Sequence, residues 1–210
     1  MKWSFHRMIK KYVLGVYNTN TYILADDKTK ICAIIDPADN GDYIVSEINN
    51  MELIPKMILL THGHFDHIYA IPHLQEIWPD IPVYCNKADI LPEDKEFFLG
   101  QYFPTLKAFS NLVNYEDGDE IQVGELTVKV MMTPGHTEGS AMFFVEDTIF
   151  SGDTLFHNSV GRTDFLGGSV EALKDSLNKI KAIQGDYKVY PGHGCDTTLK
   201  TEKLCNPFLM

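Results

Sequence analysis

Short apolar runs separated by turn residues dominate the first part of the chain and predict β-strands. Residues 5–13, 20–25 and 30–36 are rich in β-branched and aromatic side chains, and glycine, asparagine and aspartate interrupt them. Residues 56–60 form a more continuous apolar run, which is typical of a buried strand, and residues 82–85 predict another short strand.

Two segments between these strands have apolar positions at helical spacing. A helix of about ten residues is predicted from Asp42, with Ile44, Val45 and Ile48 on one face. A second helix is predicted over residues 68–78, where Pro72 is tolerable in the first turn. The alternation of strands and helices predicts layers in which helices cover the faces of a sheet.

The second half of the chain returns to strands. These are predicted at residues 120–123, 126–132, 141–145, 148–150 and 187–190. A helix over residues 169–183 has Ser169 as its candidate N-cap, and a short helix is predicted from about Thr197. We expect residues 1–210 to form a single domain.

Residues 86–117 differ from the rest because aromatic residues crowd them and strand patterning is weak. This predicts a helical insertion. Its aromatic residues either pack on the main core or form a lid or substrate wall, since insertions on a rigid scaffold often carry recognition. The sequence leaves both alternatives open.

Composition narrows the range of functions. The chain of 210 residues is 44% hydrophobic and carries a formal net charge of -11, which argues against a nucleic-acid surface built from clustered lysine and arginine. No apolar run is long enough to cross a membrane, and the N-terminus lacks the pattern of a signal peptide, so we expect a cytoplasmic protein. The four cysteines form no CxxC pair; Cys195 alone follows a histidine motif and could lie near a site.

The densest chemistry lies directly after the strand at residues 56–60. His62, His64, Asp66 and His67 fall within six consecutive residues. Histidine is the commonest metal-binding side chain, and aspartate adds a hard oxygen ligand. This stretch therefore predicts a metal site.

Three later turns repeat one arrangement, in which a strand ends, a glycine follows and a metal-binding side chain lies in the turn. They place His136 after Pro134-Gly135, Asp153 after Ser151-Gly152, and His193 after Pro191-Gly192. Together with the first stretch they provide seven donors, more than one four-coordinate ion needs. Two ions that share a bridging carboxylate would use them all.

The motifs His-x-His-x-Asp-His, Pro-Gly-His-Thr, Ser-Gly-Asp-Thr-Leu-Phe and Pro-Gly-His-Gly occur in this order. In this the chain resembles the metallo-β-lactamase fold superfamily over nearly its whole length. Within that superfamily it is similar to glyoxalase II, the hydroxyacylglutathione hydrolases, and to its short single-domain relatives. The resemblance implies an α+β fold, a four-layer αββα sandwich with the metal site at the edge of the sheets.

The resemblance also implies roles for single residues. His62, His64 and His136 would bind one metal ion, Asp66, His67 and His193 would bind the second, and Asp153 would bridge the two. Asp66 and Asp153 are the candidate catalytic carboxylates, and a hydroxide held between the ions would attack the acyl carbon of a small-molecule thioester. Asp36 would orient a ligand histidine without touching metal. Zinc is the default ion, although iron or manganese also suits ligands of this kind.

Two features bear on the substrate. Arg162, in Gly161-Arg162-Thr163-Asp164, occupies the place where the family contacts glutathione, and a structural pair with Asp164 is the alternative. Tyr115 and the aromatic residues at 97–109 are weaker candidates. A persulfide dioxygenase with one iron shares the fold and a similar Gly-Arg-Thr-Asp-Phe stretch, but its last motif reads Pro-Ala-His-Asp. The Pro-Gly-His-Gly motif therefore favours the hydrolase. No nucleic-acid or membrane partner is expected, and the sequence predicts no oligomeric state.

Overall fold

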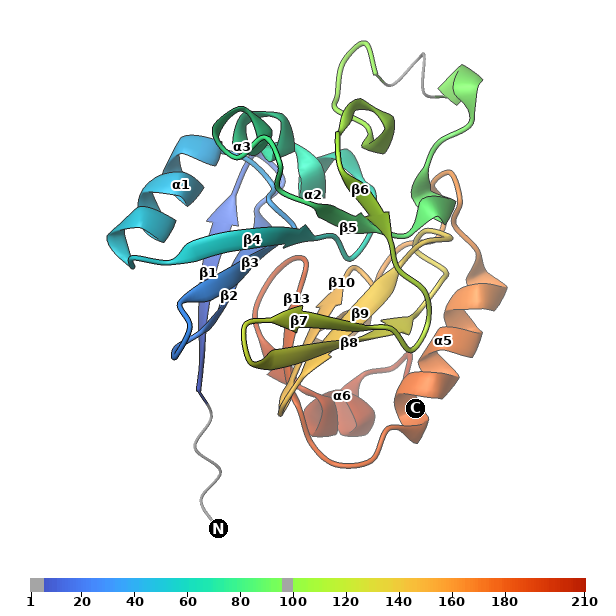
Figure 1. The fold of residues 1–210 in the computed structure, drawn as a ribbon. Coiled ribbons are helices and arrows are strands. Elements are labelled where there is room, and N and C mark those ends of the chain that lie inside the picture. Colours follow the sequence, from blue (N-terminus) through green and yellow to red (C-terminus); the bar gives the residue numbers. More distant parts are fainter. Residues whose placement is uncertain (1–5, 96–99) are drawn as a thin grey trace.

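Two six-stranded sheets, each made from one continuous half of the chain, form the centre of the computed structural model, which describes residues 6–95 and 100–210 (Figure 1). The first sheet contains, in spatial order, β1 (Arg7–Leu14), β2 (Thr19–Asp26), β3 (Ile31–Ile35), β4 (Ile54–Leu59), β5 (Val83–Cys85) and β6 (Leu112–Asn114). The strands β1 to β3 are antiparallel, whereas β3 to β6 run parallel.

The second sheet has the spatial order β14 (Thr197–Thr198), β13 (Lys188–Pro191), β10 (Thr148–Gly152), β9 (Ala141–Val145), β8 (Leu126–Met132) and β7 (Glu120–Val123). Within it, β10 and β13 are parallel and the other pairs are antiparallel. A small ribbon of β11 (Leu155–Phe156) and β12 (Ser159–Val160) follows β10.

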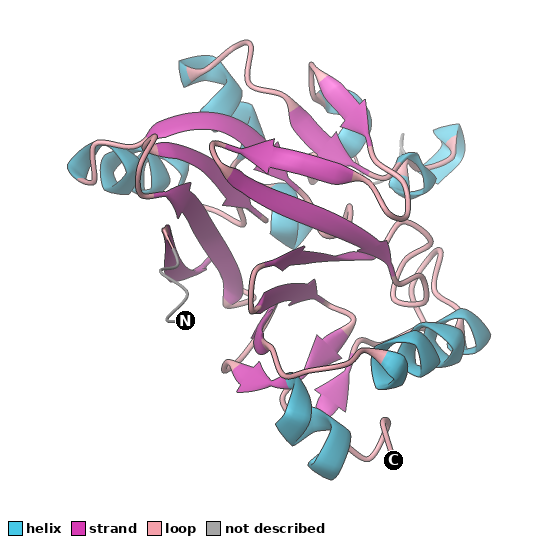
Figure 2. Cartoon of the chain, turned by 60° about the horizontal axis from the view of Figure 1, so that its bottom comes forward, coloured by secondary structure: helices cyan, strands magenta, loops and turns pink. Residues whose placement is uncertain are grey.

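Helices cover the outer face of each sheet. The first sheet carries α1 (Gly41–Asn50), α2 (Phe65–Ile68) and α3 (Ile71–Ile77), and the second carries α5 (Val170–Ala182) and α6 (Leu199–Cys205). In the rotated view of Figure 2, α6 lies beside the C-terminus and α5 lies along the same outer side of the strands. The predicted four-layer αββα sandwich is thus confirmed.

Alternation along the strands explains the layers. In β2, Ile23 faces the cluster that includes Ile44 and Ile48 of α1, while its neighbours Tyr22 and Leu24 face the cluster shared with the second sheet. Successive side chains of a strand point to opposite faces, so one strand contributes to two apolar layers. A third cluster, containing Leu177 of α5, lies between the second sheet and its helices.

Several predicted elements need correction. Part of the histidine-rich stretch forms α2, and the single helix expected over residues 68–78 is divided into the end of α2 and α3. Pro72 lies in the first turn of α3, where the missing N–H has no helical partner to lose. The first strand begins at Arg7; the predicted start at Phe5 lies outside the described residues. The helix at 169–183 is α5, and the Ser169 hydroxyl accepts from the backbone N–H of Ala172, as an N-cap does.

The segment at residues 86–117 is only partly helical. It contains the short 3₁₀ turns η1 (Lys87–Asp89) and η2 (Leu106–Ala108), and it ends in β6, which extends the first sheet beyond β5. A strand of three residues is too short to show a period of two, so the aromatic composition of the segment masked it. Residues 96–99 lie outside the described residues.

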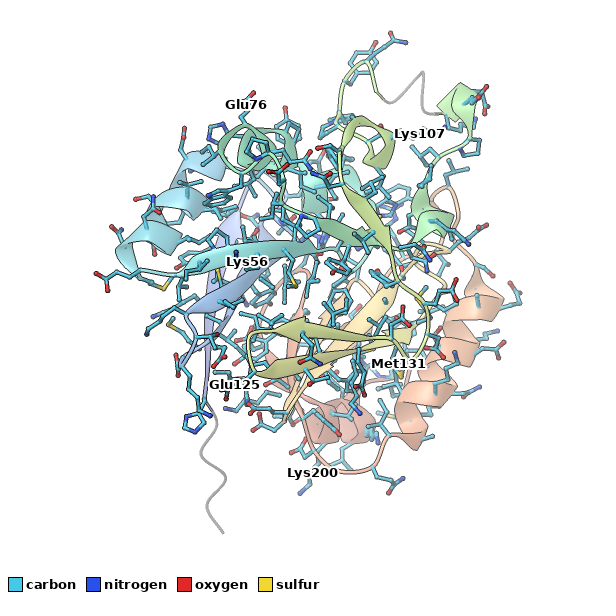
Figure 3. All side chains as sticks on the ribbon, in the orientation of Figure 1. Lys56, Glu76, Lys107, Glu125, Met131 and Lys200 are labelled. Carbon is cyan, nitrogen blue, oxygen red and sulfur yellow. The ribbon has the colours of Figure 1, made fainter. Side chains whose placement is uncertain are left out.

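Charged side chains project from both ends of the layered structure. Figure 3 shows Glu76 and Lys107 at the upper end and Lys200 at the lower end, all exposed. Among the described residues, no helix has the length and apolar composition that crossing a membrane requires.

Candidate metal centre

The histidine-rich stretch begins at the carboxyl end of β4, which lies between β3 and β5. Asp36 follows β3 at the same edge of the sheet and is 1% exposed. Its carboxylate accepts hydrogen bonds from the backbone N–H and hydroxyl of Thr61, at 2.8 and 2.7 Å, and lies 3.0 Å from Nδ1 of His67. Asp36 therefore fixes the start of the loop and the ring of His67, as a partner that orients a ligand histidine must.

The second sheet brings the other donors to this edge. Asp153 follows β10, His193 follows β13, and His136 follows the turn after β8. The two sheets meet beside them, because the backbone N–H of Asn20 in β2 donates to the carbonyl of Gly192 at 2.7 Å. A Cβ at Gly192 would lie 2.1 Å from Oδ1 of Asp153, so only glycine permits this approach.

The seven predicted donors all converge on this edge. Their nitrogen and oxygen atoms form three overlapping groups: His62, His64 and His136; Asp66, His67 and His193; and His62, His67 and Asp153. The first two groups contain the same residues that the resemblance implies for the two ions. Their role as ligands remains a prediction.

The spacing of these atoms suits a divalent ion. Nε2 of His193 lies 3.4 Å from Nε2 of His67 and 3.3 Å from Oδ2 of Asp66, which is itself 3.7 Å from His67. Ligands placed tetrahedrally at about 2.0–2.1 Å from zinc are roughly 3.3 Å apart. The carboxylate of Asp153 contacts both groups, with atoms 3.5 Å from His67, 3.6 Å from His136 and 3.5 Å from His193.

Two of the donor atoms are buried without a hydrogen-bond partner. They are Nε2 of His62 and Oδ1 of Asp153. Buried polar atoms are nearly always paired, because an unpaired one loses its hydration without compensation. A bound cation would satisfy both atoms, so the residues present fit a metal centre.

The charge states of the two groups differ. Burial and the adjacent imidazoles of His67 and His64 hold the pKa of His62 well below its usual range, and burial with His136 lowers the pKa of His64 to about 3. These rings are neutral at physiological pH and can donate a lone pair. Burial also disfavours the charged form of His67, but Asp153 and Asp36 together raise its pKa to about 9. Metal binding at His67 must therefore displace a proton.

Asp89 at the end of η1 is a residue that sequence reasoning missed. Its carboxylate accepts from the backbone N–H of Gly63 at 2.7 Å, from the backbone N–H of Gly139 at 2.7 Å and from the hydroxyl of Thr137 at 3.0 Å. Gly63 lies between His62 and His64, and Thr137 follows His136. Asp89 thus joins the two loops that carry the three-histidine group. A lone aspartate in the aromatic insertion carried no motif that would have identified it.

Arg162 contacts the centre through its backbone. Its carbonyl accepts from Nδ1 of His136 at 2.7 Å, which leaves Nε2 of that ring facing the other donors. Its guanidinium donates two hydrogen bonds to Asp164, at 2.6 and 2.7 Å, and lies over the ring of Phe165. The structural pair with Asp164 is therefore present, and the predicted contact with substrate remains a prediction.

Tyr115 and Cys195, both raised from the sequence, are not among the grouped donors. Tyr115 is 1% exposed, and its hydroxyl donates to the carbonyl of Leu60 at 2.7 Å. It therefore holds the backbone just before the histidine-rich stretch, and the expectation that it contacts substrate was wrong. Cys195 is exposed and belongs to none of the groups of donors.

Comparison with known proteins identifies the family. Residues 14–193 match the metallo-beta-lactamase superfamily, and the chain belongs to it. It is 36% identical to the probable metallo-hydrolase YqgX of Bacillus subtilis, with 100% of this chain and 98% of that protein covered. It is 34% identical to the hydroxyacylglutathione hydrolase GloC of Haemophilus influenzae, with 92% and 93% covered.

Solved structures agree with this assignment. The chain is similar to the BLEG-1 B3 metallo-beta-lactamase, at 35% identity and a TM-score of 0.83 over 97% of this chain and 100% of that one. It is similar to TTHA1623 in a di-iron-bound form, at 33% identity and a TM-score of 0.82 over 95% and 100%. ETHE1 from Myxococcus xanthus follows at 29% identity and a TM-score of 0.80, over 95% and 83%. The chain is thus a metallo-hydrolase of this superfamily.

Proposed function

We propose that this member of the metallo-beta-lactamase superfamily hydrolyses small-molecule thioesters with two divalent ions, S-lactoylglutathione being the reference substrate. The observation that supports it most directly is the position of Asp153, whose carboxylate lies within 3.6 Å of histidines from both three-residue groups. A carboxylate so placed suits a bridge between two ions better than it suits a single site.

The residues divide the task between them. His62, His64 and His136 would hold one ion, and Asp66, His67 and His193 the other. Ions held in this way supply a water of lowered pKa and polarise a carbonyl oxygen. Asp36 keeps Nε2 of His67 directed at the centre, and the Thr19 hydroxyl donates to Asp66 at 3.0 Å, which fixes that carboxylate.

The relatives bear on substrate and ion. GloC is named a hydroxyacylglutathione hydrolase, which supports a thioester. TTHA1623 was solved with two irons, which supports two ions and makes iron an alternative to zinc. The ligand set lacks thiolate, and imidazole with carboxylate accepts zinc, iron or manganese.

Two relatives define the competing activities. One competing activity is that of a persulfide dioxygenase with one iron, the alternative raised from the sequence, and ETHE1 is the similar structure that bears on it. The other is β-lactam hydrolysis, because BLEG-1 is named a metallo-beta-lactamase. The test is elemental analysis of the purified protein, followed by assays of the same preparation on S-lactoylglutathione, a glutathione persulfide with an oxygen electrode, and a β-lactam.

We expect about two metal ions per chain and thioester cleavage without oxygen uptake. One iron per chain with oxygen uptake on the persulfide would refute the proposal, as would cleavage of the β-lactam alone.

A further inference from the structure

A pocket of about 230 Å³ opens beside the metal centre and shares Asp66 with it. Val16 and Tyr17, at the tip of the hairpin between β1 and β2, line it together with Phe65 and Phe103. Phe65 lies between the predicted ligands His64 and Asp66. The pocket therefore borders the predicted centre at Asp66.

The aromatic residues form a connected wall. The ring of Phe65 stacks on Phe103 at a centroid distance of 4.2 Å and an angle of 25°, and Tyr17 meets Phe65 edge-on at 5.4 Å. The hairpin tip is unusual, because turns favour glycine, asparagine and other polar residues, whereas Val16 is 86% exposed and Tyr17 is 55% exposed. Apolar side chains held in water at the mouth of a pocket favour contact with an apolar ligand.

The charge on the hairpin side of the pocket disfavours an anion there, because Asp39 lies beside Gly15 of the hairpin. Among its described lining residues, those with a charge are Asp39 and Asp66, both acidic. A carboxylate that reached Asp39 would meet like charge, whereas Asp66 would be neutralised by its ion under the two-ion proposal.

We propose that this pocket binds an apolar, uncharged acyl group, so that the preferred substrates are aryl-acyl or medium-chain acyl thioesters rather than small hydroxyacyl or dicarboxylic ones. The inference rests on the proposed thioester hydrolysis and deepens it. The volume equals that of about eight waters, which a lactoyl group would displace only in part.

The test compares acetyl, phenylacetyl and succinyl thioesters of one uncharged thiol, N-acetylcysteamine, with the metal-loaded protein. The value of kcat/KM is divided by the alkaline hydrolysis rate of each ester, so that intrinsic reactivity cancels. We expect the phenylacetyl ester to exceed the acetyl ester by at least about tenfold, the lower bound for one added methylene in an apolar pocket. A ratio near one would overturn the proposal.

Variants localise the effect. Tyr17→Ala and Phe103→Ala should each lower the phenylacetyl-to-acetyl ratio by about tenfold. Tyr43→Ala is the matched control, because Tyr43 is 41% exposed and meets Tyr12 edge-on at 5.5 Å, away from the pocket. The ratio is taken within one variant, so the amount of folded protein does not enter. An unchanged ratio in both pocket variants would contradict the assignment.

Charge is tested separately by Asp39→Asn, which should raise kcat/KM for the succinyl ester relative to the phenylacetyl ester by about fivefold, the effect of one nearby like charge in water. If the succinyl-to-phenylacetyl ratio of kcat/KM is unchanged in Asp39→Asn, the Asp39 carboxylate does not select against a charged acyl group.

The failure of the proposed function can be told apart from failure of the pocket. If the wild-type protein cleaves none of the three esters, thioester hydrolysis is refuted, and the pocket is judged by calorimetric titration with the phenylacetyl ester. Binding about tenfold weaker in Tyr17→Ala than in wild type would support the pocket. Equal dissociation constants would overturn it.

Discussion

Replacing Asp89 with asparagine removes one charge and changes almost no volume, yet we expect a large effect. The carboxylate accepts three hydrogen bonds, from the backbone of Gly63 and Gly139 and from Thr137. An asparagine has one acceptor oxygen, and its NH₂ group must face one of the two backbone N–H groups. At least one charge-assisted hydrogen bond is lost, and the NH₂ group of the asparagine then faces the backbone N–H of Gly63 or Gly139, so that two donors meet.

The magnitude follows from these contacts. A hydrogen bond to a charged group contributes about 1.5–3 kcal/mol, so the free energy of unfolding should fall by about 2–3 kcal/mol. The loops of His64 and His136 would separate, and removal of a supporting group of this kind lowers metal affinity by about 10–100-fold. Under the two-ion proposal, the ion at the three histidines should be lost while the ion at Asp66, His67 and His193 is retained.

The assay is urea unfolding together with metal titration against a chromophoric chelator. Asp117→Asn is the matched control, because Asp117 also accepts a backbone N–H, from Met132 at 2.7 Å, and contacts neither loop. If Asp89→Asn keeps the metal content and the unfolding midpoint of the wild type, the carboxylate does not hold the loops together and the reasoning is wrong.

Three further variants examine other contacts. Asp153→Ala should abolish thioester hydrolysis and lower the metal content measured by elemental analysis, since its carboxylate contacts both groups; unchanged content and rate would refute the two-ion arrangement. Asp36→Asn should weaken metal binding by about 10–100-fold in the same chelator titration, because Nδ1 of His67 loses its carboxylate partner; an affinity equal to that of the wild type would contradict this. Glu202 is fully buried, and although burial opposes its charge, bonds from Thr197 and Asn158 hold its pKa below the usual value. A lowered pKa stabilises the fold above about pH 4.3 and the benefit is lost as pH falls, so urea unfolding of Glu202→Gln should show a smaller loss of stability from about pH 7 to about pH 3. An equal loss in both proteins would disprove it.

The sequence predicted the donors of the centre better than their supports. His62 was identifiable because it begins a dense group of donors directly after a strand, and His136 and His193 because each follows a strand and a glycine-containing turn. Asp89 was not, since its partners are mainly backbone N–H groups of loops that only the folded chain brings together. The same holds for β6, whose three residues are a strand only because β5 lies beside them.

The division of the chain between the sheets has a consequence for assembly. Strands β1 to β6 come from one half of the chain and β7 to β14 from the other, so each sheet can form from contacts within its own half. Each three-residue group nevertheless takes members from both halves: His136 joins His62 and His64, and His193 joins Asp66 and His67. An ion bound by either group would hold the two halves of the chain together. Metal uptake would then follow the docking of the halves, and its rate would report that late step of folding.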